Sequence, residues 1–462
     1  MIKTVKDVNT DAFIALVRAR TADRGKKYLV MTFGCQQNEA DSEKIRGMAE
    51  LMGYAPADSA DTADLIIVNT CAIRRHAEMK ALSMLGRLKA RKKANPELII
   101  GVVGCMAAEE HITDMLKKDF HYVTFTAEPS MLHRIPELVA RYIDEGRRSF
   151  VFGADEWDIV EGISEKRTHG HKAWVSVMYG CNNFCSYCIV PYVRGRERSR
   201  ASADVIRECR ELVLSGVREI TLLGQNVNSY RSDMSFAELL LNIAKIEGDF
   251  LIRFMTSHPK DTSSELIDVM AAYPEKIAPY FHLPLQAGSN SVLRAMNRTY
   301  TAEKYLSVVE ELRAKIPGIS ISTDIIVGFP GESEEDFLET LKILEKVRYD
   351  MVYAFIYSPR EGTRAAEMEN RVSEKEQSER LTRLLAIQDG ISYEKNLPYL
   401  GRTERVLVDS YEERDGEIIY TGRTATAKLA HFTSDSAAVG EFVNVKIERI
   451  GAFDLFGTEE RK

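Results

Sequence analysis

Residues 181–188 read Cys181-Asn182-Asn183-Phe184-Cys185-Ser186-Tyr187-Cys188, a C-x₃-C-x₂-C spacing. Three thiolates this close can bind three irons of one [4Fe–4S] cube, and no fourth cysteine lies nearby. Ferredoxin-type clusters have four cysteine ligands, so three cysteines leave one iron open for a small molecule. The alternative is a structural zinc site, which uses four ligands, usually as two C-x₂₋₄-C pairs, and no histidine or second pair is within reach. The spacing favours a cluster with an open iron.

Three other cysteines, Cys35, Cys71 and Cys105, lie far apart in the sequence but share one context. Each follows an apolar, β-branched run, at residues 27–32, 64–69 and 98–103. Such runs, separated by helix-like stretches, predict buried strands of a parallel sheet. Because ligands gather at the carboxyl edge of that sheet, we expect the three thiols to converge on a second three-cysteine cluster. The alternative is three unrelated buried cysteines.

Composition narrows the class of protein. The chain has 462 residues, enough for about three domains, and a net charge of −7, so nucleic-acid contacts would have to come from local basic patches. No apolar run approaches the ~18–20 residues of a membrane span, and residues 1–10 lack the apolar region of a signal peptide. Cysteines used as thiolates indicate a reducing compartment, so we expect a cytoplasmic protein without membrane contact. The seventh cysteine, Cys209, has the helical spacing of a core thiol.

The pattern along the chain predicts an α/β protein in five parts. They are an N-terminal extension (1–25), a parallel-sheet α/β domain (26–149), a polar linker (150–170), an open six-unit (β/α) barrel (171–395) and a small all-β barrel (396–462). Six strands are expected in the open barrel, at 173–178, 218–223, 251–255, 279–283, 319–327 and 351–356, with helices that include 302–315 and 334–347. Strands of the small barrel are expected at 404–409, 417–423, 425–429 and 442–450.

The loops that follow the six strands are where such a barrel carries its chemistry. The cysteine triplet follows the first strand, and small, polar or turn residues follow each of the others. One polar loop means little, because polar loops are ordinary. Six on one rim around a cluster describe a site.

The chain resembles the methylthiotransferase family of radical S-adenosylmethionine (SAM) enzymes over nearly its whole length. Residues 26–149 resemble the family's N-terminal domain, 171–395 its radical SAM core and 396–462 its RNA-binding TRAM barrel. The stretches CIVPYVRGRE (188–197), LLGQNVNSY (222–230) and SHP (257–259) resemble the branch that modifies isopentenylated adenosine in tRNA. One departure is Gln37, near Cys35, where methionine is expected.

The resemblance implies a reaction and its cofactors. The hydrogen at C2 of N6-isopentenyladenosine, at tRNA position 37, is replaced by a methylthio group. That hydrogen is not acidic, so a radical is a sensible route. The cluster at Cys181, Cys185 and Cys188 would reduce SAM to a 5′-deoxyadenosyl radical. The [4Fe–4S] cluster at the other three cysteines would supply or carry sulfur, and a second SAM would give the methyl group.

The resemblance also implies partners: the tRNA anticodon stem-loop and a flavodoxin- or ferredoxin-like electron donor, with the protein a monomer. Tyr187 is expected to lie against the SAM adenine or to support the backbone. Gln225 and Asn226 are expected to hold the amino-acid end of SAM or to cap a helix. Gly328 would permit close backbone approach to SAM. His258 is as consistent with structure as with ligand contact.

Basic residues leave the RNA contacts open. Four arginines within residues 194–200 suit phosphates or the SAM carboxylate, or else they are solvated surface charge. Candidate RNA contacts in the small barrel are Arg402, Arg405, Arg423, Lys428 and Lys446, although acidic residues of the same segment weaken that case.

Functions of other kinds remain open from the sequence. They are a methylthiotransferase for threonylcarbamoyl-adenosine or a ribosomal-protein aspartate, an RNA-binding scaffold with a structural cluster, and an electron-transfer protein. Two three-cysteine sites argue against the last two, because structural and electron-transfer clusters are normally fully ligated.

Overall fold

The computed structural model describes residues 10–73, 75–151, 159, 161–163, 165–414 and 416–460. They form two compact units, each described below by itself. The first comprises residues up to 168 together with 178–182 and 188–198, and the second comprises 169–177, 183–187 and the chain from 199 onward. The first nine residues of the predicted extension and much of the predicted linker (152–158, 160 and 164) lie outside the described residues. No described helix is both long enough and apolar enough to cross a membrane.

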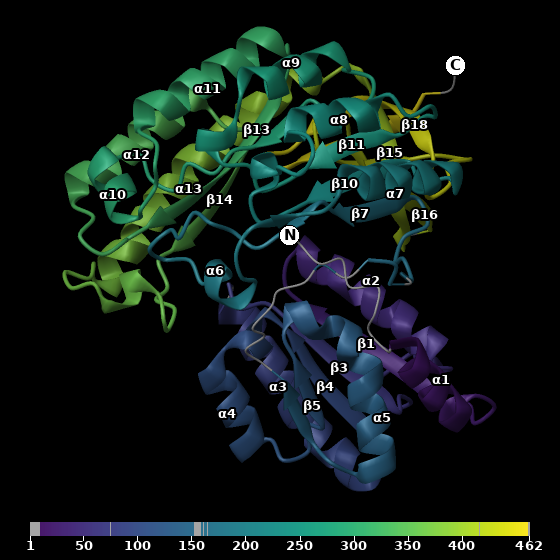
Figure 1. Cartoon of the computed structure of the whole chain (residues 1–462). Helices are drawn as coiled ribbons and strands as arrows, with labels where there is room; N and C mark the ends of the chain where they lie inside the picture. The colour runs from purple at the N-terminus through teal and green to yellow at the C-terminus, as the bar shows by residue number, and fades with distance from the viewer. Residues whose placement is uncertain are drawn as a thin grey trace. The chain divides into compact units, whose positions relative to one another are not determined.

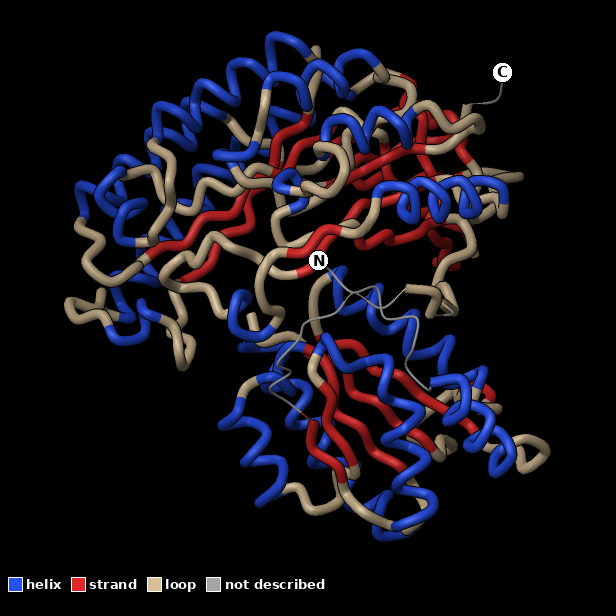
Figure 2. Tube along the Cα trace, in the orientation of Figure 1, coloured by secondary structure: helices blue, strands red, loops and turns tan. Residues whose placement is uncertain are grey.

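The first unit is built on a parallel six-stranded sheet with the order β2-β1-β3-β4-β5-β6 (Figures 1 and 2). Its strands are β1 (Lys27–Phe33), β2 (Ala55–Pro56), β3 (Leu65–Thr70), β4 (Ile99–Gly104), β5 (Phe125–Ala127) and β6 (Ser149–Val151). Its longer helices are α1 (Thr10–Thr21), α2 (Gln36–Leu51), α3 (Arg75–Ala94), α4 (Glu110–Asp119) and α5 (Ile135–Glu145). The predicted parallel α/β fold is confirmed.

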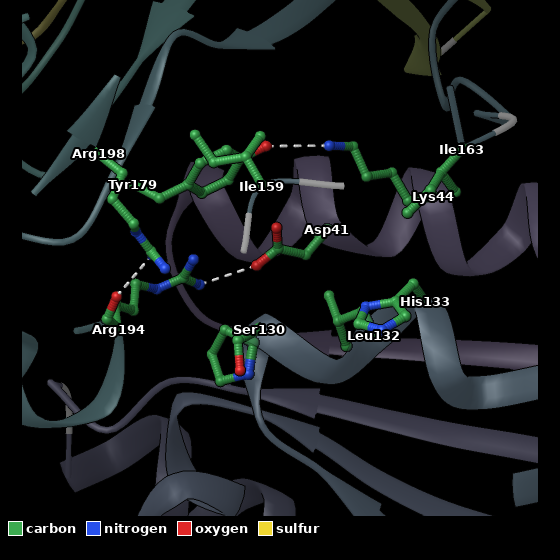
Figure 3. A pocket seen from close by; sticks show the side chains of 11 residues that line it. Asp41, Lys44, Ser130, Leu132, His133, Ile159, Ile163, Tyr179, Arg194 and Arg198 are labelled. Carbon is green, nitrogen blue, oxygen red and sulfur yellow. Dashed lines mark hydrogen bonds and ion pairs between the residues drawn. The ribbon is translucent and has the colours of Figure 1, made fainter. Parts of the chain in front are cut away.

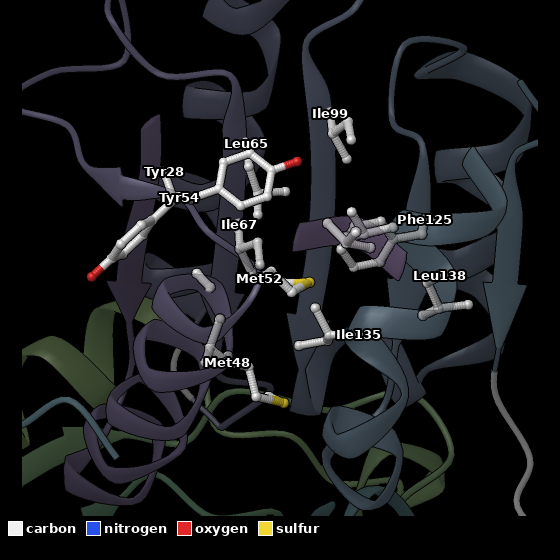
Figure 4. Packing of buried hydrophobic residues seen from close by; sticks show 14 of the residues in the cluster. Tyr28, Met48, Met52, Tyr54, Leu65, Ile67, Ile99, Phe125, Ile135 and Leu138 are labelled. Atoms are coloured by element: carbon white, nitrogen blue, oxygen red, sulfur yellow. The ribbon is translucent and has the colours of Figure 1, made fainter. Parts of the chain in front are cut away.

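Helices cover both faces of this sheet because its central strands are apolar on both sides. Leu65 and Ile67 of β3 pack into a core with α1, α2 and α5, shown in Figure 4. Ile66 and Val68, which point to the other face, pack into a core with α3 and α4. Because Val17 of α1 is fully buried in the first core, the described part of the predicted extension belongs to the body of this unit.

The second unit contains the six predicted barrel strands in two parallel sheets, β11-β10-β7 and β12-β13-β14. They are β7 (Lys172–Ser176), β10 (Glu219–Leu223), β11 (Leu251–Phe254), β12 (Tyr280–His282), β13 (Ser320–Val327) and β14 (Met351–Ile356). Helices α9 (Ser264–Ala272), α10 (Asn290–Ala295), α11 (Ala302–Lys315) and α12 (Glu334–Val347) form an outer arc in Figure 1. The unit also contains α7 (Ser202–Leu214), α8 (Phe236–Ala244) and α13 (Glu374–Asn396), the last of which packs against β14. Helices α11 and α12 have the predicted bounds, and Cys209 is buried on α7.

The C-terminal segment forms a closed barrel with the order β15-β16-β17-β19-β18. Its strands are β15 (Thr403–Arg414), β16 (Glu417–Thr424), β17 (Leu429–Thr433), β18 (Phe442–Ile450) and β19 (Asp454–Glu459). The strand predicted at 425–429 is misplaced: residues 425–428 connect β16 to β17 with Ala427 at φ +65°, and the strand itself begins at Leu429. The sequence does not predict strand β19, because Gly457 weakens its pattern. A Cβ at Gly457 would lie 1.9 Å from the Lys446 carbonyl oxygen, so the close pairing there requires glycine.

Buried charges attach this small barrel to the rest of the second unit. The guanidinium of Arg253 pairs with Glu219 at 2.6 Å and donates to the carbonyl oxygens of Thr424 and Ala425 at 2.7 and 2.8 Å. Lys428 is buried and pairs with Asp350 at 2.9 Å. The barrel is therefore docked by specific polar contacts.

Replacing Arg253 with alanine should loosen this attachment. The change leaves the Glu219 carboxylate buried without its strongest partner and removes both donors to the barrel, a loss of about 3–5 kcal/mol. Hydrogen exchange should accelerate at the amides of β16 and β17. The exposed pair Arg405–Asp249 provides the control, since Arg405→Ala should cost at most about 1 kcal/mol. A larger effect from Arg405→Ala would show that the surface pair holds the barrel.

Candidate functional site

The carboxyl edge of the first sheet brings three cysteines to neighbouring strand ends. Pairing aligns Phe33 with Thr70 on β1 and β3, and Thr70 with Gly104 on β3 and β4. Cys71 and Cys105 follow this row directly, while Cys35 follows Phe33 by two residues. The register of the sheet thus produces the convergence that the sequence predicted.

The thiols interact with one another. The hydrogen bond between the Cys35 and Cys71 thiols lowers the pKa of Cys35 to about 6, with a further contribution from the charge of Arg194, while burial opposes the shift. The same hydrogen bond and burial raise the pKa of Cys71. Burial raises the pKa of Cys105. One thiolate is therefore favoured in this group before any ligand binds.

A buried arginine, Arg194, lies beside these cysteines; Figure 3 shows its side chain directed toward Asp41. Arg194 is 4% exposed; its Nε donates to Cys105 Sγ at 3.0 Å, and its Nη2 pairs with Asp41 Oδ2 at 2.8 Å. Gln37, the departure from the family pattern, donates from Nε2 to Asp41 Oδ1 at 3.2 Å. Gln37 therefore acts on the cysteines through Asp41 and Arg194.

The first site fits an anionic iron–sulfur cluster. It gathers three thiols, of which Cys35 has a lowered pKa, and places a permanent cation beside them that can offset the charge of bound thiolates. Among the described side chains, no three His, Cys, Asp or Glu residues are arranged to hold a single metal ion. A cube binds each thiolate through a different iron, so that finding concerns single-ion sites.

The middle cysteine of the triplet lies in the second unit, on a loop held by the end of α10. Ser186 donates from its backbone N to the Met296 carbonyl at 3.0 Å, and Asn297 Nδ2 donates to the Phe184 carbonyl at 2.8 Å. Arg298, also buried, donates from Nη1 to Cys185 Sγ at 3.4 Å. A second buried guanidinium thus contacts a second cysteine sulfur.

The outer cysteines of the triplet belong to the first unit. Cys181 donates from its backbone N to the Gly195 carbonyl at 3.2 Å. Gly180 before it has φ +75°, and a Cβ there would lie 2.1 Å from the Arg196 carbonyl oxygen, so the chain needs glycine for this approach. Cys188 leads into the short helix α6 (Val190–Val193), which packs beside Cys105.

The predicted SAM contacts lie in loops of the second unit. Tyr187 packs edge-on against Phe329, with ring centroids 6.5 Å apart. Gln225 is half-buried shortly after β10. Asn226 makes no capping bond; its Nδ2 donates to Asp261 at 2.7 Å, and its buried Oδ1 has no protein partner in the described part of the chain. The capping alternative therefore fails for Asn226.

Gly328 and His258 both have structural explanations. Gly328 has φ +71°, and a Cβ there would lie 2.3 Å from Cγ of Gln377 on α13, so the close approach is to a helix of the same unit. Its backbone N donates to Glu332, which pairs with Arg380 at 2.8 Å. Burial lowers the pKa of His258 to about 2, which keeps the ring neutral.

Strands β12 to β14 carry a group on one face that the sequence did not reveal. His282 Nδ1 bonds Ser322 Oγ at 2.8 Å, and its Nε2 lies 3.5 Å from Asp324. Tyr353 packs edge-on against His282, and both Tyr353 and Phe355, which lie on β14, are 43% exposed. We call these five residues the β12–β14 face. Side chains alternate between the two faces along each strand, and the pairing aligns His282 with Ser322 and Asp324 with Tyr353, so these residues share one face of the sheet.

The arginine run and the barrel cations are less available than predicted. Arg194 and Arg200 are buried, and Arg200 pairs with Glu208 at 2.8 Å. In the barrel, Lys428 is buried against Asp350, and Arg405, although exposed, is paired with Asp249. That leaves Arg402, Arg423 and Lys446 as the better-placed barrel cations.

Two known protein families match this chain, one in the first unit and one mainly in the second. Residues 175–344 match the family described as "Radical SAM superfamily", and residues 27–127 match "Uncharacterized protein family UPF0004". Among solved structures, the radical S-adenosylmethionine methyltransferase TsrM from Kitasatospora setae aligns with a TM-score of 0.52 and 13% identity, covering 74% of this chain and 77% of that chain. An identity this low supports the fold alone.

Full-length relatives carry the family assignment. The tRNA-2-methylthio-N(6)-dimethylallyladenosine synthase of Carboxydothermus hydrogenoformans is 48% identical over 94% of this chain and 99% of its own length. The enzyme of the same name from Alkaliphilus oremlandii is also 48% identical, over 94% of this chain and 93% of its own length. The chain therefore belongs to the methylthiotransferase family of radical SAM enzymes.

Proposed function

We propose that this protein is the enzyme that converts N6-dimethylallyladenosine at tRNA position 37 to its 2-methylthio derivative. The observation that carries the proposal is 48% identity to synthases of this name over nearly the entire chain. It favours this substrate over threonylcarbamoyl-adenosine or a ribosomal-protein aspartate. The direct test is nucleoside analysis of tRNA from cells that lack the protein, in which the methylthio product should be absent and the unmethylthiolated nucleoside should accumulate.

The cofactors of the family are two [4Fe–4S] clusters and SAM. When bound, they supply SAM reduction at one cluster and sulfur at the other. Cys181, Cys185 and Cys188 would ligate the first cluster, and Cys35, Cys71 and Cys105 the second. Tyr187, Gln225, Asn226 and Gly328 remain the proposed SAM contacts; Asn226 has the clearest support, because its buried Oδ1 faces no protein donor among the described residues.

Partners and location follow as further proposals. The anticodon stem-loop would be the RNA element bound, and a flavodoxin- or ferredoxin-like protein would donate electrons. The enzyme would act as a monomer in the cytoplasm. Four of the five predicted parts would keep their roles: the methylthiotransferase domain (26–149), a linker (150–170), the radical SAM domain (171–395) and the TRAM barrel (396–462). The predicted N-terminal extension (1–25) would instead be part of the first unit, because its described residues pack into that core.

The two cysteine groups should separate in their effects. Cys71→Ala should reduce the iron content from about eight to about four per chain, and SAM should still be cleaved because only the other cluster is needed. Methylthiolated tRNA should vanish. Cys181→Ala should also leave about four irons but abolish SAM cleavage. Cys209→Ala, a buried cysteine outside both groups, is the control and should retain both clusters. Sustained product formation by Cys71→Ala would refute the second cluster.

We further propose that the β12–β14 face receives the modified base and its tail. Two half-exposed aromatic rings offer a stacking surface for a base and an apolar wall for a five-carbon tail, whose burial yields about 0.8 kcal/mol per CH₂. The neighbouring polar group of His282 and Asp324 offers hydrogen bonds to the edges of the base.

Tyr353→Ala and Phe355→Ala should therefore raise KM for the isopentenylated stem-loop. Removing one stacked ring costs about 1–3 kcal/mol, roughly 5- to 150-fold. SAM cleavage without RNA should stay unchanged, because the cluster loop is intact. Leu338→Ala serves as the control, since Leu338 is similarly exposed, at 39%, but lies on the outer helix α12. Equal KM values for Tyr353→Ala and Leu338→Ala would place the base elsewhere.

The barrel cations should contribute RNA affinity by neutralising phosphates. Replacing Arg402, Arg423 or Lys446 with alanine should lower the slope of log K against log salt by roughly 0.7–0.9 for each phosphate that is no longer neutralised. Arg405→Ala is the internal control, because its guanidinium is held by Asp249 and lies over the Phe442 ring. Filter-binding titrations over a range of salt concentrations measure the slope. If the three variants and the control share one slope, RNA is bound by another surface.

A further inference from the structure

Each predicted cluster site has one buried arginine that donates to a cysteine sulfur. Arg194 reaches Cys105 at 3.0 Å in the first unit, and Arg298 reaches Cys185 at 3.4 Å in the second. Neither arginine lies within the C-x₃-C-x₂-C segment, and they come from different parts of the chain. The recurrence suggests a shared role toward the clusters.

Arg194 carries a charge that is partly offset. Asp41 is buried and takes one side of the guanidinium, and Gln37 donates to the other oxygen of that carboxylate. Because Asp41 and Gln37 are on helix α2, the strength of the cation at Cys105 depends on that helix. Arg194 also lines a small recess of about 50 Å³ with Lys44, Tyr179 and Arg198 (Figure 3).

Arg298 carries a charge without a carboxylate partner among the described residues. Its Nε donates to the Tyr300 hydroxyl at 3.1 Å, and its Nη2 donates to the Pro284 carbonyl at 3.3 Å. Both partners are neutral acceptors that fix the plane of the guanidinium. The cation is thus aimed at Cys185 by a rigid neutral frame.

We propose that Arg194 and Arg298 are positioning residues that set the reduction potentials of the two clusters, a role that rests on the cluster assignment above. Hydrogen bonds to cluster sulfurs and nearby charge both set such potentials. Reduction adds one electron, and hence one negative charge, to a cluster. A fixed cation stabilises the reduced form more than the oxidised form, so each arginine raises the potential of its own cluster.

Each arginine can be tested on one cluster at a time in the full-length chain. The cluster beside Arg194 is isolated in the triple variant Cys181→Ala/Cys185→Ala/Cys188→Ala, and the cluster beside Arg298 in Cys35→Ala/Cys71→Ala/Cys105→Ala. Dithionite supplies the electron, and EPR spectroscopy at a series of poised potentials gives the reduced-to-oxidised ratio. Arg194→Gln and Arg298→Gln, each in the background that retains its own cluster, should lower that ratio tenfold at fixed potential, a shift of about 59 mV for one electron.

The variant Asp41→Asn distinguishes an effect of charge on the reduction potential from an effect of disturbed folding. It removes the anion beside Arg194, so the ratio for that cluster should rise, opposite in sign to Arg194→Gln. The double variant Arg194→Gln/Asp41→Asn removes both charges, leaves no buried ion alone, and should fall between the two. Arg194→Lys keeps the positive charge but loses the planar guanidinium with its several N–H donors. It should lower the reduced-to-oxidised ratio less than Arg194→Gln does.

Crossed variants complete the design. Arg298→Gln should leave the potential of the cluster at Cys35, Cys71 and Cys105 unchanged, and Arg194→Gln should leave that of the other cluster unchanged. Shifts of equal sign from Arg194→Gln and Asp41→Asn, or no shift from either arginine variant in its own cluster, would overturn the proposal. Because the readout is a potential and not a product, these outcomes are distinct from a failure of tRNA methylthiolation by the unaltered enzyme.

Discussion

Parallel pairing of β1, β3 and β4 is the constraint from which the first site follows. In-register strands end in one row, so cysteines placed just after three strands meet although they are far apart in the sequence. A parallel sheet must also be covered by helices on both faces. Apolar side chains on both faces of β3 pack against helices on each side. The same covering helix α2 that completes the core brings Asp41 and Gln37 to the cysteines. Core and site are therefore products of one alignment.

Thiolates in a buried site require a counter-charge, and here it comes from a residue that is distant in the sequence. Arg194 follows the cysteine triplet in sequence but serves Cys105. The arginine-rich stretch that could have been a phosphate-binding surface is instead used mainly inside the protein, since Arg200 also pairs internally. Burying a guanidinium is costly unless it is paired, and each of these has a partner of opposite charge.

Sequence patterns predicted the features that depend on local spacing, but not those that depend on how the strands pair or on contacts between distant residues. The six cysteines, the six barrel strands and the bounds of α11 and α12 follow from spacing and periodicity, which residues carry in themselves. The β12–β14 face could not be predicted, because which residues share a side depends on how the strands align. Arg298 carries no local signal, since its partner Cys185 lies far away in the sequence. The misplaced strand at 425–429 arose because a left-handed turn at Ala427 looks extended in sequence.

The docked position of the C-terminal barrel has a consequence for how a long substrate is handled. Buried contacts from Arg253 and Lys428 join the barrel to the body that carries the β12–β14 face, so no flexible linker separates them. If the barrel binds RNA as proposed, the local concentration of the bound RNA's nucleotides at the β12–β14 face depends on the geometry of the RNA and not on a linker. Affinity should then depend on the length of the substrate. Stem-loops that are too short to span the barrel and the β12–β14 face would bind more weakly, and lengthening them beyond that span would add no affinity.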